Sequence, residues 1–288
     1  MTARRGDLRL RIAIGRWMVW PAILFTAVFF VMPLVVMIGV SFWDRGSGAI
    51  ATAWTVQNYI KFFTRGYLLV ALVNSVEVTL ITTVLSVLLA YPLAYVLAFH
   101  ISGRWQKIIL LVAVLPFWTS YVVRSYSWLL IVSDNGFLNG LLLRIGLISE
   151  PLKIAYTRSA TVLGFVHFFV MLLTLTIYAN LVQISTSYIK AAQDLGAGQL
   201  TVLRRIILPL SIPGVAVGAF LTFVITIGDY VTPQILGGNT EVLIPQAIML
   251  QIVRSADWPM ASVMSLVLML LVTAVYMVFQ RHLRMDRV

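Results

Sequence analysis

Residues 72–98 read LVNSVEVTLITTVLSVLLAYPLAYVLA, and Glu77 is the only charged side chain among them. An apolar run of about 20 residues is long enough to cross the hydrocarbon core of a bilayer as a helix. The whole chain has the same character, since 60% of its 288 residues are hydrophobic and 11% are charged, whereas a soluble domain has roughly 25% charged residues. We therefore predict an all-α, polytopic transmembrane bundle.

Six such spans are predicted, so both chain ends should lie on one side of the membrane. The first follows a basic leader but is longer than the h-region of about 7–15 residues in a signal peptide, and no A-x-A-like cleavage site follows it. The predicted organisation is a basic N-terminus at 1–16, a six-span domain at 17–279 and a C-terminal segment at 280–288. The spans are 17–41, 72–98, 108–132, 160–182, 212–236 and 261–279.

Basic residues in the loops predict the orientation, because Lys and Arg accumulate on the cytoplasmic side. Thirteen of them fall on the side that holds both termini and seven on the other, while Arg124 lies within a span. Both termini are therefore predicted to be cytoplasmic. Since the net charge of +11 is spread over short loops instead of one face, it does not indicate nucleic-acid binding.

The longest cytoplasmic connection, residues 183–211, is predicted to form two short helices with a glycine corner. Its apolar residues recur at helical spacing, its glycines turn the chain, and Pro209 should end the second helix. An amphipathic helix pair lying on the membrane surface is the alternative to a docking element for a cytoplasmic partner. The first apolar stripe is Ile189, Ala192 and Leu195, and the second is Leu203, Ile206 and Ile207.

Ala191-Ala192, Gly196 and Ile207-Leu208-Pro209 resemble the coupling loop of ABC importer permeases. Similarity to the spermidine/putrescine type extends over the chain, through LPFWT at 115–119, RSYSW at 124–128 and GDYVTPQ at 228–234. The resemblance implies a bacterial inner-membrane permease domain at 17–279 that imports a polyamine-like solute by alternating access. It also implies a heterodimer with a second permease, two copies of a cytoplasmic ATPase, an extracytoplasmic binding protein and surrounding lipid.

The resemblance further implies that this chain binds no cofactor, because ATP and Mg²⁺ belong to the ATPase. The family loop begins Glu-Ala-Ala, whereas Lys190 stands first here and reverses the charge. Either the cognate ATPase carries a complementary acid, or the contact rests on the apolar face and Gly196, with Lys190 at the rim. The implied coupling residues are Lys190, Ala191, Ala192, Asp194, Gly196, Leu208 and Pro209.

Three ionisable residues, Glu77, Arg124 and Asp229, fall inside predicted spans. A charge at a helix centre costs about 2.5–3.5 kcal/mol on insertion scales, so it usually faces the bundle interior or a wet cavity. All three are expected at a similar depth in the outer half, where Arg124 would pair with one of the two acids. The pair would leave one net negative charge for a cationic solute, while the alternative is a structural ion-pair cluster.

Aromatic residues surround Arg124 and extend the predicted substrate pathway. Phe117, Tyr121 and Trp128 are predicted to fall on one helix face by i, i+3, i+4 and i+7 spacing, although such a stripe is more often packing. Pro116 and Pro233, with Gly228 nearby, could free backbone carbonyls that face a cavity. For Pro116 we expect only a plain kink in the helix. The pathway candidates are Glu77, Trp118, Tyr121, Arg124, Trp128, Asp229 and Tyr230.

Enzymatic alternatives find little support in the residues. The chain has no phosphate-binding loop and no HExxH motif, and its three histidines lack ligand spacing, so no metal site is predicted. His167 is expected to be a hydrogen-bonded packing residue. An intramembrane aspartyl protease needs two carboxylates that share a proton. Its Gly-x-Gly-Asp motif would place a glycine two residues before Gly228, but that residue is Thr226. Glu77, the only other acid within a predicted span, lacks the Tyr-Asp setting expected for the second carboxylate.

An ion- or proton-coupled secondary transporter is the remaining alternative, because it would also use buried charges. No internal repeat indicates the inverted duplication that many such transporters contain. The loop at 183–211 discriminates, since an ATP-driven permease needs a rigid element that converts ATPase closure into movement of the spans. The sequence therefore favours a transport subunit without its own ATPase site.

Overall fold

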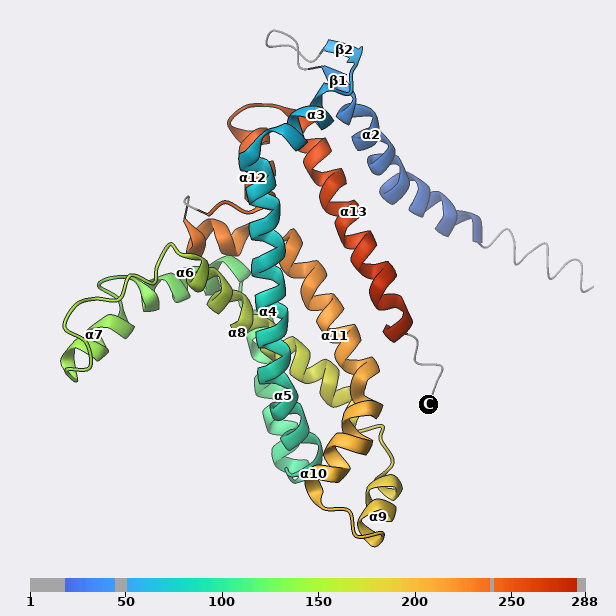
Figure 1. The fold of residues 1–288 in the computed structure, drawn as a ribbon, viewed down its shortest axis with the longest axis vertical. Helices are drawn as coiled ribbons and strands as arrows, with labels where there is room; N and C mark the ends of the chain where they lie inside the picture. The colour runs from blue at the N-terminus through green and yellow to red at the C-terminus, as the bar shows by residue number, and fades with distance from the viewer. Residues whose placement is uncertain (1–18, 45–50, 239–240, 284–288) are drawn as a thin grey trace, which may run out of the picture. The chain divides into compact units, whose positions relative to one another are not determined.

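The computed structural model describes residues 19–44, 51–238 and 241–283 (Figure 1). The described residues are helical apart from one two-stranded hairpin and the loops, as the sequence predicts. The predicted N-terminal segment 1–16 and the last five residues lie outside the described part. Two compact units, Met1–Thr64 with Gln251–Leu266 and Arg65–Leu250 with Val267–Val288, are considered separately.

The first unit contains an apolar helix, Val19–Ser41, followed by a small polar module. Asn58 anchors that module, because its side-chain amide donates to the carbonyls of Ser41 at 3.1 Å and Trp43 at 2.8 Å. The Tyr59 hydroxyl lies 2.7 Å from Ser41 Oγ. The elements are η1 (Ala27–Val31), α2 (Met32–Ser41), β1 (Trp43–Asp44), β2 (Ala51–Trp54), α3 (Gln57–Thr64) and the start of α13 (Trp258–Leu283).

The second unit is built on three long helices, α4 (Gly66–Phe99), α8 (Arg158–Leu181) and α11 (Leu208–Gly228), which pack against one another. Their shared core includes Ala90, Ala94, Leu173 and Ile177, all fully buried. Helices in lipid associate through close packing of small residues rather than through the hydrophobic effect. The other elements are α5 (Gly103–Trp118), α6 (Tyr121–Val132), α7 (Phe137–Arg144), α9 (Thr186–Asp194), α10 (Gln199–Val202), η2 (Leu203–Ile207), η3 (Pro233–Gly237) and α12 (Ile244–Val253), which continues into the first unit.

Two glycines one turn apart let α11 approach α8. A Cβ added at Gly214 would lie 2.5 Å from Asn180 Cβ, and one added at Gly218 would lie 2.6 Å from Leu173 Cδ2. The spacing is the small-xxx-small pattern of close helix packing in membranes. The α8–α11 contact therefore has no room for a side chain at Gly214, while a side chain at Gly218 would require the end of Leu173 to shift.

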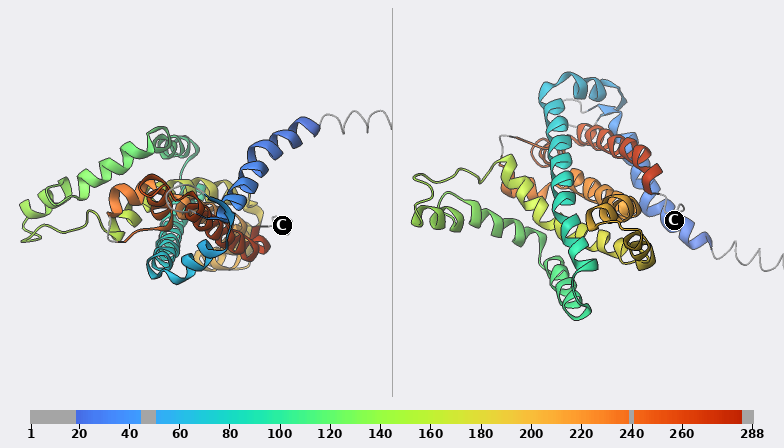
Figure 2. Two further views of the ribbon diagram at one scale, coloured as in Figure 1. Left: turned by 90° about the horizontal axis from the view of Figure 1, so that it is seen from above. Right: turned by 60° about the horizontal axis from the view of Figure 1, so that its bottom comes forward.

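The third predicted span, 108–132, is wrong as a continuous helix. Helices α5 and α6 are separated at Thr119–Ser120 and bend by 96° (Figure 2). Five described helices are long and apolar enough to cross a membrane, and this bent pair would make a sixth. The fifth predicted span also ends early, at Gly228, since η3 is a separate helical segment.

The loop at 183–211 contains the predicted glycine corner. Gly196 has φ +82° and follows α9, which ends at Asp194. Pro209 does not end the second helix, because residues 199–228 form one helical stretch. The π-helical turn η2 ends at Ile207, two residues before Pro209. In an α-helix the proline ring would clash with the carbonyl four residues earlier, and the wider π-helical turn avoids this clash. Leu195 does not join the buried stripe and is 90% exposed, whereas Ile189 and Ala192 pack on the core.

Replacing Gly214 with alanine tests the close contact between α8 and α11. Alanine is favoured over glycine in a helix by about 1 kcal/mol, but the new Cβ would overlap Asn180, and overpacking costs roughly 1–3 kcal/mol. We expect Gly214→Ala to lower the thermal stability of the purified protein. Gly39→Ala is the control, since Gly39 is helical with nothing within 4 Å of its added Cβ. Equal melting temperatures for both variants would contradict the packing described.

Candidate functional site

The bend between α5 and α6 is held by Arg124. Pro116 lacks an N–H, and residues 119–120 are extended, so carbonyls at the end of α5 lose their helical partners. The Pro116 carbonyl accepts from Arg124 Nη1 at 2.9 Å and from Thr119 Oγ1 at 2.8 Å. A cation at a helix C-terminus also interacts favourably with the helix dipole. The Pro116 carbonyl thus has no helical partner because α5 ends at Trp118, and the chain shows a break of 96° instead of a plain kink at the proline.

The predicted ion pair of Arg124 with Glu77 or Asp229 is not formed. The guanidinium carbon lies 4.4 Å from the Phe168 ring centroid and 5.0 Å from that of Tyr121. Aromatic faces attract a cation, more strongly where water is excluded. Phe117 packs against Phe168, with ring centroids 5.0 Å apart. The expected aromatic surroundings exist, but they come from three helices rather than one.

Asp229 joins α11 to the next helical turn and bonds to α6. Its carboxylate accepts the backbone N–H of Val231 at 2.9 Å and that of Thr232 at 3.3 Å, as an N-cap does. It also accepts the Tyr121 hydroxyl, which lies 2.5 Å from Thr232 Oγ1. Most of its hydrogen-bonding capacity is thus used inside the protein.

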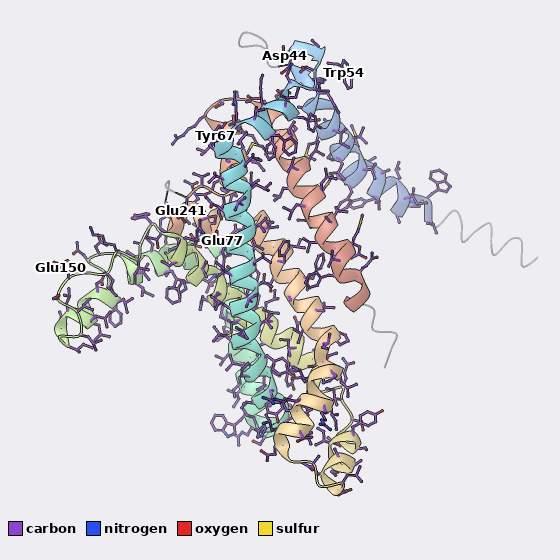
Figure 3. All side chains as sticks on the ribbon, viewed as in Figure 1. Asp44, Trp54, Tyr67, Glu77, Glu150 and Glu241 are labelled. Atoms are coloured by element: carbon purple, nitrogen blue, oxygen red, sulfur yellow. The ribbon has the colours of Figure 1, made fainter. Side chains whose placement is uncertain are left out.

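Glu77 pairs with Arg158, not with Arg124. Arg158 Nη1 lies 2.6 Å from Glu77 Oε2, Nε lies 2.6 Å from Glu241 Oε2, and Nη2 donates to Asn74 Oδ1 at 2.9 Å. All three guanidinium nitrogens therefore have an acceptor, and α4, α8 and the segment before α12 are tied together. Figure 3 labels Glu77 and Glu241 on these segments. One cation against two carboxylates leaves one excess negative charge, and both acids are nearly half exposed.

A cavity of about 550 Å³ lies beside the bend, lined among others by Arg124, Trp128 and His167. The Trp128 and His167 rings meet edge to face with centroids 5.3 Å apart. His167 Nδ1 is buried without a hydrogen-bond partner among the described residues, so the hydrogen-bonded packing expected for this ring is not found at that atom.

Two pathway candidates, Trp118 and Tyr230, remain. Trp118 is 78% exposed at the end of α5, and Tyr230 is 41% exposed after Asp229. Sequence reasoning missed Arg158, Asn74, Glu241, Phe168 and Thr232. Arg158 directly precedes an apolar run, where an arginine usually extends to the membrane interface, and only the folded chain brings Glu77 and Glu241 to it.

Most of the implied coupling residues are exposed. Lys190, Ala191, Asp194, Gly196, Leu208 and Pro209 are exposed, while Ala192 is half-buried. The α9 N-terminus is capped by Ser185, whose hydroxyl accepts from Ser187 N at 3.3 Å. No group of His, Asp or Glu that could hold a metal occurs among the described residues.

Residues 90–285 match a protein family described as binding-protein-dependent transport system inner membrane component. The chain is 29% identical to the spermidine/putrescine transport system permease protein PotB of Escherichia coli (strain K12), over 89% of this chain and 93% of that protein. It is 31% identical to PotB of Haemophilus influenzae, over 90% of this chain and 91% of that protein.

Solved structures support the fold. A chain of a bacterial ABC transporter involved in the import of the acidic polysaccharide alginate aligns with a TM-score of 0.75, at 18% identity, over 96% of this chain and 99% of that one. A chain of a bacterial alginate ABC transporter in complex with a periplasmic protein gives 0.77 at 16% identity, over 97% and 96%. The helical membrane fold is therefore that of these transporter chains.

Replacing Arg158 with glutamine tests the three-way contact. Glutamine cannot neutralise two carboxylates, so Glu77 and Glu241 would repel each other, and exposed pairs of this kind contribute up to about 1 kcal/mol each. We expect Arg158→Gln to lower the melting temperature of the purified protein, and Glu77→Gln with Glu241→Gln in the same chain to recover part of the loss. Arg144→Gln is the control, because no described residue pairs with Arg144. A loss no larger than that of the control would contradict the contact.

Proposed function

The chain belongs to the family of binding-protein-dependent transport system inner membrane components, and on that basis we propose that it is the permease subunit of a polyamine importer. Members of this family are multi-pass inner-membrane transport subunits and not ATPases. Similarity to two polyamine permeases over about nine-tenths of the chain carries the proposal, at 29% and 31% identity. A secondary transporter is not favoured, because the family works with separate partners.

The charges of the described site are consistent with a cationic solute. Arg158 with Glu77 and Glu241 leaves one excess negative charge, and the exposed acids are free to attract a cation from water. Asp229 and Arg124 oppose each other in sign, but Arg124 lies against the Tyr121 and Phe168 rings, which stabilise its charge. The proposed pathway follows Glu77, Tyr121, Asp229 and Tyr230, with aromatic rings beside it that suit an amine.

The proposed assembly is a heterodimer with a second permease, two copies of a cytoplasmic ATPase that binds ATP and Mg²⁺, and an extracytoplasmic binding protein. Both termini and the loop 183–211 would then be cytoplasmic. ATPase closure would push this loop, and the paired bundles would alternate between outward and inward access. The stiffness of the loop is supported by its core contacts through Ile189 and Ala192.

Lys190 lies at the exposed edge of α9, where the family sequence has an acid. Because an exposed rim charge changes specificity and association rate more than affinity, we place the main ATPase contact on Ala191 and the Gly196 corner. Lys190 would select the cognate ATPase. A residue turned toward the core, such as Ile189, would carry force to the spans.

Substrate class is tested by uptake of labelled spermidine into cells that express the complete transporter. Unlabelled putrescine should compete with it, since the acids recognise amines. An acidic oligosaccharide at the same concentration should not compete. Competition by the acidic sugar but not by putrescine would contradict the polyamine assignment while leaving the family assignment intact.

Gly196→Val tests coupling. Nothing lies within 4 Å of the added Cβ, so the effect comes from the backbone, whose φ of +82° is strained for a β-branched residue. We expect uptake to fall at least several-fold while the ATPase still hydrolyses ATP and the protein still inserts. Gly196→Asn is the matched control, because asparagine tolerates this conformation. Uptake by the Gly196→Val variant at the wild-type rate would contradict the coupling role of Gly196.

A further inference from the structure

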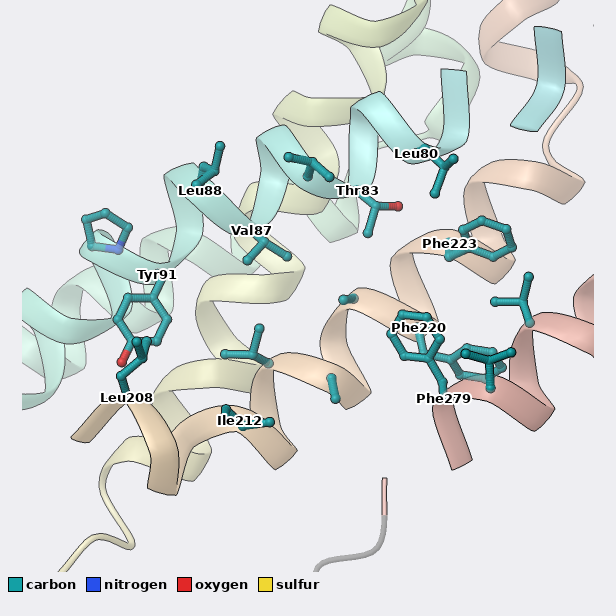
Figure 4. Close-up of a pocket in the computed structure, with 17 residues that line it drawn as sticks. Leu80, Thr83, Val87, Leu88, Tyr91, Leu208, Ile212, Phe220, Phe223 and Phe279 are labelled. Atoms are coloured by element: carbon teal, nitrogen blue, oxygen red, sulfur yellow. The ribbon is translucent and has the colours of Figure 1, made fainter. Parts of the chain in front are cut away.

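A long apolar groove, separate from the polar clusters, lies between α4, α11 and the end of α13 (Figure 4). Its volume of about 990 Å³ is at the upper end of the roughly 300–1,000 Å³ typical of ligand pockets. Thr83 and Tyr91 are the only polar residues in its lining. The Tyr91 hydroxyl is already engaged, 3.0 Å from Ser211 Oγ. The groove therefore offers a solute almost nothing to hydrogen-bond.

The groove runs along a stripe of α11 that continues into two arginines. Leu208, Ile212 and Phe220 line it at helical spacing. Arg204 and Arg205 lie in η2, within one turn before the lining residue Leu208. Because a π-helical turn holds more residues than an α-helical one, Arg204 lies closer to the stripe than Arg205 does. Both arginines are exposed, and neither makes an ion pair within the described part of the chain. One end of the apolar groove is thus within a helical turn of two cations that have no ion-pair partner among the described residues.

From this arrangement we propose that the groove binds an anionic phospholipid, with its acyl chains along α4 and α11 and its phosphate on Arg204 and Arg205. Arginine binds phosphate oxygens through two parallel N–H donors, which gives both strength and geometry. Basic groups near a membrane surface attract anionic lipids by about 1 kcal/mol each. A lining without free polar groups suits a hydrocarbon chain and offers no hydrogen-bond partner to a polyamine.

The dimensions of the groove agree with a lipid chain. Leu208 to Phe223 is 16 residues, and its 15 steps of about 1.5 Å each give about 22 Å of helix. Half of the hydrocarbon core is roughly 15 Å thick, so the groove is longer than one leaflet. An acyl chain that enters beside the arginines can therefore lie in the groove through the whole leaflet. Because Arg204 and Arg205 belong to the loop at 183–211, a lipid held there contacts the element proposed to transmit ATPase movement.

The test uses the complete transporter in phosphatidylcholine vesicles that contain a small fraction of phosphatidylglycerol with a photoactivatable acyl chain. After illumination, labelled peptides are identified by mass spectrometry. We expect label on residues 80–92 and 208–223. Arg204→Gln with Arg205→Gln should reduce it several-fold, whereas Arg104→Gln with Lys107→Gln, a matched loss of two positive charges outside the groove, should not.

A second pair of variants separates the groove from the arginines. Leu88→Trp fills the groove from an exposed lining position, while Leu89→Trp places the same side chain one residue away, outside the lining. Leu88→Trp should reduce the label several-fold and Leu89→Trp should leave it unchanged. Equal labelling by a phosphatidylcholine probe would overturn the proposal in favour of ordinary annular lipid. No label on these peptides, with cross-links from the groove to the partner permease, would overturn it in favour of a protein helix.

Discussion

The absence of water inside a bilayer is the constraint on which this structure depends. A backbone carbonyl that loses its helical partner there must find another within the protein. The α5–α6 bend is possible because Arg124 and Thr119 both donate to the Pro116 carbonyl. The break after α11 is possible because the Asp229 carboxylate accepts two backbone N–H groups of the following turn. The two charges expected to form an ion pair are instead used to stabilise two breaks in helices.

The sequence was sufficient for features that depend on one segment alone. Apolar length predicted the spans, and Gly196 predicted the corner after α9. It was insufficient where a side chain's partner lies on another helix: Glu77 pairs with Arg158 across 81 positions of the chain, and no local pattern encodes that. Leu195 shows the same limit, because helical spacing placed it on the stripe of Ile189 and Ala192, while the chain turns away from the core at Gly196.

The likeness to solved structures concerns the fold and not the solute. Chains of transporters that import an acidic polysaccharide share the fold at 16–18% identity, whereas the polyamine permeases share more of the sequence. The fold therefore does not identify the solute, which has to be argued from particular side chains. In this chain Glu77 and Glu241 together carry one more negative charge than Arg158 neutralises.

The energy source is the most direct test of the proposed role. Spermidine uptake would be measured in vesicles that contain this chain with its partner permease, ATPase and binding protein, supplied with either ATP or an imposed proton gradient. An ATP-driven permease predicts uptake that requires ATP and all partners and is indifferent to the gradient. Uptake by this chain alone, driven by the gradient without ATP, would contradict it and identify a secondary transporter.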